Sequence, residues 1–234
     1  MTLSISYRTF GAVCLCAVLA GCFGSNSSTP VGVGGGGAGG AGGGAGGGAG
    51  GGAGGGSLTA YETAFSAVQA NVPTQTALTG TASHTGQVKV LTNANTANTD
   101  EAVVGDLSMT VNFDANSRPI DATVNNLAGE INGTATTING SLTTANAPNQ
   151  VNAVSATTVN IPGQGPATLT GLSVGLEGTL TDPTGTLSGD ALMTLQGSFV
   201  GANGVGAFGA NSVVIRPTTG ADIITGGTFY TNRN

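Results

Sequence analysis

Charged side chains are scarce in this 234-residue chain, in which Lys and Arg together number 5 and Asp and Glu 11. So few cations leave no basic surface to attract the phosphates of a nucleic acid. Tryptophan is absent, and His84 is the single histidine. A zinc site needs three or four nitrogen, sulfur or oxygen ligands, and no activated nucleophile is visible. We therefore expect a protein that is not an enzyme, holds no metal and binds no nucleic acid.

Cysteine is also rare, and all three cysteines lie near the start of the chain, at Cys14, Cys16 and Cys22. Arg8 precedes an apolar run over 10–20 that is typical of a secretory signal and too short to span a membrane as a helix. Cys14 and Cys16 fall inside this signal. Their removal with it leaves the mature chain without a disulfide.

The signal ends in Leu19-Ala20-Gly21-Cys22, which resembles the bacterial lipobox. This resemblance implies thioether lipidation of Cys22 and cleavage just before it. Two or more acyl chains, such as palmitate, anchor a protein stably where one does not. Residue 23 is Phe rather than the Asp associated with inner-membrane retention, so the resemblance favours the outer membrane.

A glycine- and alanine-rich tract follows, and from Gly34 to Gly56 it is a near-regular Gly-Gly-Gly-Ala repeat. It lacks the prolines and the three-residue period of collagen. Glycine loses the most conformational entropy on ordering, so we expect a disordered tether that spans about 30–35 Å on average. The chain thus divides into a signal peptide (1–21), a lipidated linker (22–56) and a folded domain (57–234).

The domain is predicted to open with one short helix. Apolar residues there recur at three- and four-residue spacing and share one face: Leu58, Tyr61, Phe65, Val68 and Val72. Thr59 followed by Glu62 reads as a capping box at the N-terminus, and Pro73 ends the helix.

After Pro73 the apolar period changes from that of a helix to two, which is typical of strands with one buried face. Alternation is clear over 107–113, 151–161 and 191–199, and weaker around 88–90. Turn signals separate these runs, the strongest being Asp182-Pro183-Thr184-Gly185, where glycine supplies a positive φ. Glycines within the predicted strands mark bends and bulges: Gly80, Gly86, Gly105 and Gly197. The sequence therefore predicts an all-β fold, a single antiparallel β-barrel of about eight strands that follows one short helix.

A membrane-spanning barrel is an alternative, but it needs aromatic girdles at both interfaces. With seven Phe and three Tyr in the whole chain, we favour a barrel whose interior is filled by side chains.

Four segments resemble the β-barrel of the transferrin-binding protein B family of surface lipoproteins. TGTASHTGQVKV, from Gly80 with its preceding Thr79, is similar to the opening strand, and 105–127 is similar to the next hairpin. Residues 185–210 resemble the closing signature, and 226–233 the last strand. The chain departs from the family in size, because it has room for one small barrel and not for two lobes. The resemblance implies ligands that are host or nutrient carriers of iron or haem. His84 stands where the family usually has an aromatic residue.

These observations favour a lipid-anchored outer-membrane protein, exposed at the cell surface, whose barrel loops recognise a host or nutrient protein or haem. His84 is a weak candidate for a haem ligand if it lies at an open barrel end, although a lone strand histidine more often faces solvent or is hydrogen-bonded. No other ligand-binding residue is identified. A structural or accessory envelope lipoprotein with no ligand of its own fits the same residues. We expect a monomer attached to the membrane only through its N-terminal lipid.

Overall fold

The computed structural model describes residues 57–92, 101–161 and 165–234. Cys22 and the glycine-rich linker lie outside these described residues. One α-helix, α1 (Leu58–Gln69), precedes the strands, and two short 3₁₀ helices, η1 (Thr144–Asn146) and η2 (Ala202–Gly204), lie between them. The strands are β1 (Thr81–Leu91), β2 (Ala102–Asn112), β3 (Ile120–Ile131), β4 (Thr134–Gly140), β5 (Leu142–Thr143), β6 (Asn152–Ile161), β7 (Gly165–Thr181), β8 (Gly189–Val200), β9 (Gly206–Arg216) and β10 (Ile223–Arg233).

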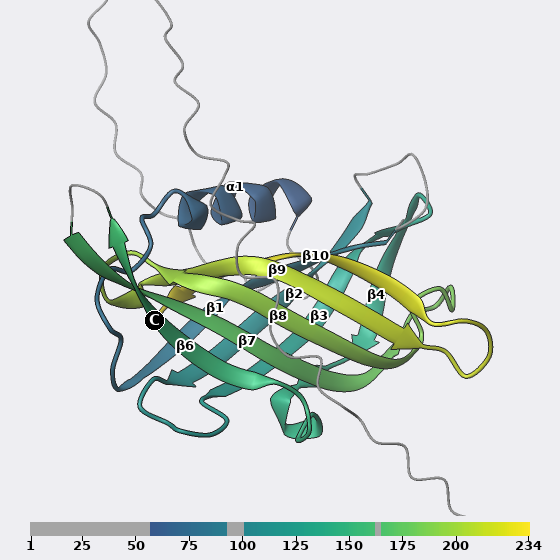
Figure 1. The fold of residues 1–234 in the computed structure, drawn as a ribbon. Coiled ribbons are helices and arrows are strands. Elements are labelled where there is room, and N and C mark those ends of the chain that lie inside the picture. The colour runs from purple at the N-terminus through teal and green to yellow at the C-terminus, as the bar shows by residue number, and fades with distance from the viewer. Residues whose placement is uncertain (1–56, 93–100, 162–164) are drawn as a thin grey trace, which may run out of the picture. The chain divides into compact units, whose positions relative to one another are not determined.

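Antiparallel pairing closes the strands into a barrel. The ring runs β1-β2-β3-β4-β7-β8-β9-β10, and β10 pairs back onto β1. The two-residue strand β5 bridges β3 and β7, while β6 pairs with β7 alone. Figure 1 shows the long strands β7 to β10 side by side along one wall. The predicted all-β barrel of about eight strands is therefore confirmed.

Alternation of buried and exposed residues along much of the strands fills the barrel interior. In β2, Leu107, Met109 and Val111 are buried, whereas Asp106 and Ser108 between them are exposed. Successive side chains of a strand point to opposite faces, so one set lines the core and the other the outer wall. The largest fully buried side chains inside the barrel are Phe199, Phe229, Leu107, Ile120, Leu127, Ile131, Leu142, Leu176, Met193, Leu195 and Ile215.

The predicted helix is present, but its capping differs from the prediction. Ser57, not Thr59, is the N-cap, and its hydroxyl accepts a hydrogen bond from the Ala60 N–H at 3.2 Å. The capping-box prediction is wrong because the chain enters the helix two residues earlier. The helix also ends before Pro73, and Val72, predicted on the apolar face, is 67% exposed.

Helix α1 packs on the outside of the barrel, where it crosses β9 and β10 (Figure 1). Tyr61 is fully buried, its ring lies 5.4 Å from that of Tyr230, and its hydroxyl hydrogen-bonds the Thr228 hydroxyl at 2.8 Å. Lys89 of β1 forms an ion pair with Glu62 of the helix. The helix is thus fixed to the wall by a second apolar cluster, separate from the barrel core.

Two predicted irregularities of the chain have clear structural causes. Gly105 lies where the register between β2 and β3 shifts, so it marks the predicted bulge. The turn at Asp182 forms as expected, with Gly185 at φ 75° and its N–H donating to the Asp182 carbonyl at 3.1 Å. Gly80 is different, because it precedes β1 instead of lying within a strand.

The predicted buried face of β6 is wrong. The alternation over 151–161 predicts that the odd-numbered residues face the core, yet Ala153, Ser155 and Thr157 are all exposed. Val154, from the opposite face of the strand, packs against the core. Small apolar and hydroxyl residues occur on both faces of this strand, so the sequence pattern does not identify which face is buried.

Candidate binding site on the barrel wall

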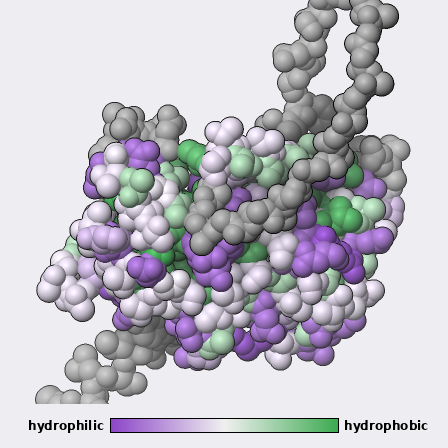
Figure 2. Space-filling view, turned by 180° about the vertical axis from the view of Figure 1, so that it is seen from behind, coloured by the Kyte–Doolittle hydropathy of each residue, from purple (hydrophilic) through white to green (hydrophobic). Residues whose placement is uncertain are grey.

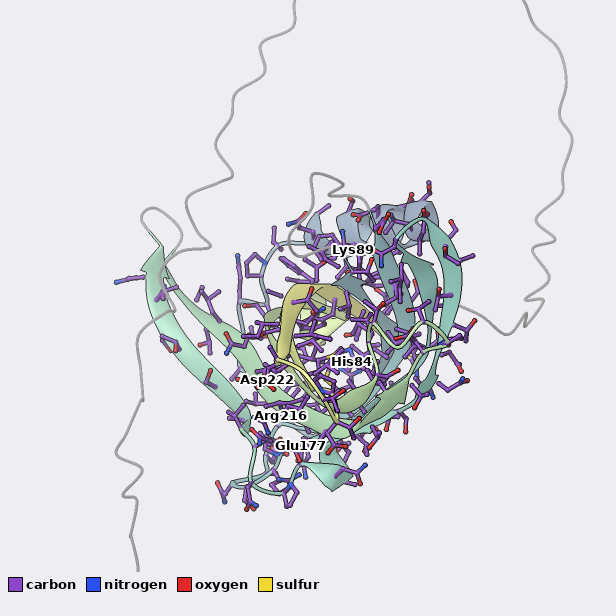
Figure 3. All side chains as sticks on the ribbon, turned by 90° about the vertical axis from the view of Figure 1, so that its right-hand side faces the viewer. His84, Lys89, Glu177, Arg216 and Asp222 are labelled. Carbon is purple, nitrogen blue, oxygen red and sulfur yellow. The ribbon has the colours of Figure 1, made fainter. Side chains whose placement is uncertain are left out.

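His84 lies inside the barrel rather than at an open end or facing solvent, and it keeps one long hydrogen bond. Its side chain is 1% exposed, and its ring centroid lies 5.6 Å from that of Phe199. Nδ1 lies 3.5 Å from the Thr231 hydroxyl, and Nε2 has no hydrogen-bond partner among the described residues. Figure 3, which looks along the barrel, places His84 within the ring of strands. Burial of this kind does not favour His84 as an axial haem ligand.

Burial of the imidazole makes the barrel sensitive to acid. Burial first, and the Arg233 guanidinium second, lower the pKa of His84 from 6.5 to about 4. The unfolded chain therefore takes up this proton before the folded barrel does. The free energy of unfolding therefore does not depend on this proton above pH 6.5. It falls as the pH decreases from 6.5 towards 4, and this contribution does not change further below 4. At 1.36 kcal/mol per pKa unit, the loss is about 3 kcal/mol.

We predict that His84→Phe removes this part of the pH dependence, because phenylalanine has no proton to gain. Urea unfolding at pH 7 and pH 4 measures the difference for each protein. The wild type is expected to lose about 3 kcal/mol more than the variant between these two pH values. An equal loss in both proteins would show that His84 does not cause the acid sensitivity.

The outer wall, in contrast to the filled interior, carries a row of hydroxyl groups. Thr85 of β1 pairs with Ser108 of β2, Ser108 with Thr123 of β3, and Thr123 with Thr143 of β5. These residues fall on the outward side of the alternation, opposite buried neighbours such as Met109. The register of four strands therefore aligns hydroxyls that are far apart in the sequence. Figure 2 shows one face of the molecule, on which pale and purple residues cover most of the surface.

This row forms the floor of an open groove of about 500 Å³. Ser83, Thr110 and Asp121 line it beside the row, and Asn234 closes one side by accepting a hydrogen bond from the Thr85 hydroxyl at 2.8 Å. The groove thus presents many hydroxyls and the Asp121 carboxylate, with no lysine or arginine among its lining residues, and the nearly buried His84 also borders it. Such a surface suits a neutral or weakly cationic polar partner.

A ridge formed by residues 144–148, which include η1, borders the groove on one side. Arg118 holds this segment by donating to the carbonyl oxygens of Thr144 at 2.7 Å and Pro148 at 2.9 Å. The Thr144 hydroxyl also accepts from the Ala122 N–H of β3 at 3.1 Å. The side chain of Arg118 therefore ties the segment around η1 to the start of β3.

A second groove of about 440 Å³ lies on the other side of the ridge and is more strongly charged. Glu177 accepts a hydrogen bond from the Gln150 amide at 2.6 Å, and Asp190 accepts one from Thr179 at 3.0 Å. Arg216 lies 3.7 Å from Asp222 across an exposed ion pair (Figure 3). The acidic groups here are already partnered, so the first groove is the better candidate for recognition.

We also searched the described ranges for metal sites and membrane-spanning helices. No group of three or more His, Cys, Asp or Glu residues there could hold a metal ion. No helix in those ranges has the length and apolar character needed to cross a membrane. Cys22, the predicted lipidation site, lies outside them.

The sequence-based prediction placed recognition on the barrel loops and named His84 alone, as a weak candidate. The groove instead depends on strand register and on the ridge at η1. The sequence does contain a pattern that indicates the hydroxyl-bearing outer face, because Ser and Thr alternate with buried residues at 83 and 85 and again at 108 and 110. No protein-family model matches the chain, and a search of curated proteins finds no matching sequence.

Proposed function

We propose that this protein is a lipid-anchored binding protein of the outer membrane, which presents its barrel at the cell surface. Cys22 carries the lipid, and residues 22–56 serve as the tether. The barrel binds its partner through the hydroxyl-lined groove on the outer wall. The single observation that carries the proposal is the contrast between an interior filled by side chains and an aligned row of hydroxyls outside.

The partner class follows from the resemblance to the transferrin-binding protein B barrel and is a host or nutrient carrier of iron or haem. We favour a carrier protein over free haem. Free haem needs an axial ligand and an apolar slot, whereas the His84 side chain is nearly buried and most of the residues that line the groove are Ser or Thr. A protein surface rich in backbone carbonyls and amides suits an open polar groove, because each hydroxyl can both donate and accept.

A substitution in the centre of the groove tests this proposal. Ser108→Arg places a long side chain in the hydroxyl row, where we expect it to weaken binding to a carrier at least about tenfold. Ser212→Arg is the matched control, because Ser212 is an exposed hydroxyl on β9 that lines neither groove. Binding of the immobilised full-length protein to transferrin and haemoglobin can be measured by interferometry.

Selective loss of binding in Ser108→Arg would support the groove as the binding site. Equal binding by both variants would contradict the groove, although not the lipid-anchored binding role itself. Failure of the wild type to bind any carrier would favour an accessory envelope lipoprotein with no ligand of its own.

A further inference from the structure

Strand β6 has one free edge in the part of the chain that the structure describes. It pairs with β7 over its full length, from Asn152↔Val174 to Ile161↔Gly165, and with no other strand. Only its start is attached elsewhere, because the Asn152 side chain donates to the Ile120 carbonyl at 2.7 Å and accepts from the Ile120 N–H at 3.0 Å. Figure 3 shows the hairpin of β6 and β7 extending away from the ring of strands.

The backbone groups on this free edge can be identified from the hydrogen-bond pattern. The Gly175 N–H donates to the Val151 carbonyl at 2.7 Å, so odd-numbered residues from 151 onward bond to β7. The even-numbered residues therefore direct their N–H and C=O groups away from β7. These are Val154, Ala156, Thr158 and Asn160. The Thr158 and Thr168 hydroxyls lie 3.3 Å apart, as expected for a pair without backbone bonds between its members.

This edge carries none of the usual protection against strand pairing. Proteins commonly block a free edge with lysine, proline or a bulge. Strand β6 has the sequence NAVSATTVNI, which contains no charge, no proline and no glycine and is rich in β-branched residues. Both faces are also accessible, because Ala156, Thr157 and Thr158 are exposed. An uncharged, β-prone strand with an open edge is a template for a further strand.

The absence of charge extends well beyond β6. No Asp, Glu, Lys or Arg occurs between Glu130 and Glu177, although the chain as a whole has a net charge of −6. Two copies could therefore meet at β6 without placing like charges opposite each other. A strongly charged partner would gain nothing from this surface. A second copy of the same chain offers both an open strand edge and an uncharged surface.

We propose that β6 pairs antiparallel with β6 of a second copy, about a two-fold axis. One register uses every free backbone group, because it pairs Ala156 with Thr158 of the other copy and Val154 with Asn160. Thr157 then faces its own counterpart, and threonine pairs across strands are favourable. A two-fold interface of this kind is self-complementary and closes at a dimer. The sequence alone favours a monomer, since it does not reveal the free edge.

Sedimentation of the chain from residue 22 onward, with Cys22→Ala to keep it free of lipid, tests the dimer. We expect a dimer fraction that rises with protein concentration. Thr158→Pro removes an N–H on the free edge and leaves the bonds to β7 intact, so it should sediment as a monomer. Ala156→Lys places like charges in the interface and should weaken dimerisation at least about tenfold. Ser212→Lys adds the same charge on β9 and should leave the dimer unchanged.

Cross-linking tests the register and does not depend on proline being tolerated. Thr157→Cys should form a disulfide-linked dimer on mild oxidation, because cross-strand Cα atoms at such a pair lie within disulfide range. Ala153→Cys faces the far end of the partner strand and should cross-link poorly. A wild type that stays monomeric at all concentrations would overturn the proposal. So would equal cross-linking of the two cysteine variants, or unchanged dimerisation in a folded Thr158→Pro.

Discussion

Replacing Cys22 with alanine is expected to move the protein from the membrane fraction to the soluble fraction, while the unfolding temperature of the barrel stays the same. The thioether-linked acyl chains are the proposed attachment, and each buried methylene contributes about 0.8 kcal/mol to membrane binding. Without the cysteine there is no thiol to acylate. Helix α1 and the strands lie far along the sequence from residue 22, so the fold should not sense the change.

Cys16→Ala is the matched control for this release. Cys16 lies in the apolar run of the proposed signal and is removed with it, so this variant should remain in the membrane fraction. Fractionation followed by immunoblotting measures both variants. Retention of Cys22→Ala in the membrane would contradict the anchor assignment, and release of both variants would point to a general failure of export.

Gly209→Ala is expected to be among the most damaging single-methyl changes in the barrel wall. Gly209 of β9 faces Gly197 of β8. A methyl group on Gly209 would overlap the carbonyl oxygen of Gln196 and lie 2.5 Å from the Gly197 Cα. The strands would have to separate at this pair to make room for the methyl group. We expect a loss of about 3 kcal/mol in the free energy of unfolding.

Gly171→Ala provides the control for this substitution. Gly171 is also a strand glycine, but the nearest atoms to an added methyl there are 3.4 Å away, an ordinary contact. Its effect should stay below about 1 kcal/mol. Urea denaturation of the two variants gives the comparison. Similar stabilities would show that the wall can accommodate a methyl group at Gly209.

Much of the fold could be predicted from the sequence, because a strand with one buried face must alternate. The run from Leu107 to Phe113 alternates without a break, and its apolar residues do face the interior. Closure of the sheet into a barrel could also be predicted, because a sheet of many short strands with internal glycines tends to curl. The turn at Asp182 followed from proline and glycine chemistry alone.

Other features depend on tertiary contacts that no local pattern records. The position of β6 outside the ring follows from the splitting of the β7 edge, where β4 and β5 occupy one part and β6 the other. The burial of His84 follows from its place on the inner side of β1 and from packing against Phe199. A single polar residue within an otherwise regular strand does not reveal which side it occupies.

The candidate groove could be predicted only in part. The hydroxyls at 83, 85, 108 and 110 could be assigned to an outer wall once alternation was recognised. Their alignment into one row requires the register between strands, which is set by bulges and turns. The ridge depends on Arg118, whose bonds to Thr144 and Pro148 join segments about thirty residues apart. Sequence spacing gives no indication of such contacts.

Protease treatment of intact cells is the most direct test of a barrel held at the cell surface by a lipidated tether. Elastase cleaves after small residues, and the alanines between Gly34 and Gly56 offer it many sites. We predict that brief treatment releases a folded fragment beginning near residue 57, with no need to permeabilise the outer membrane. Release only after permeabilisation would place the barrel on the periplasmic side and contradict surface binding.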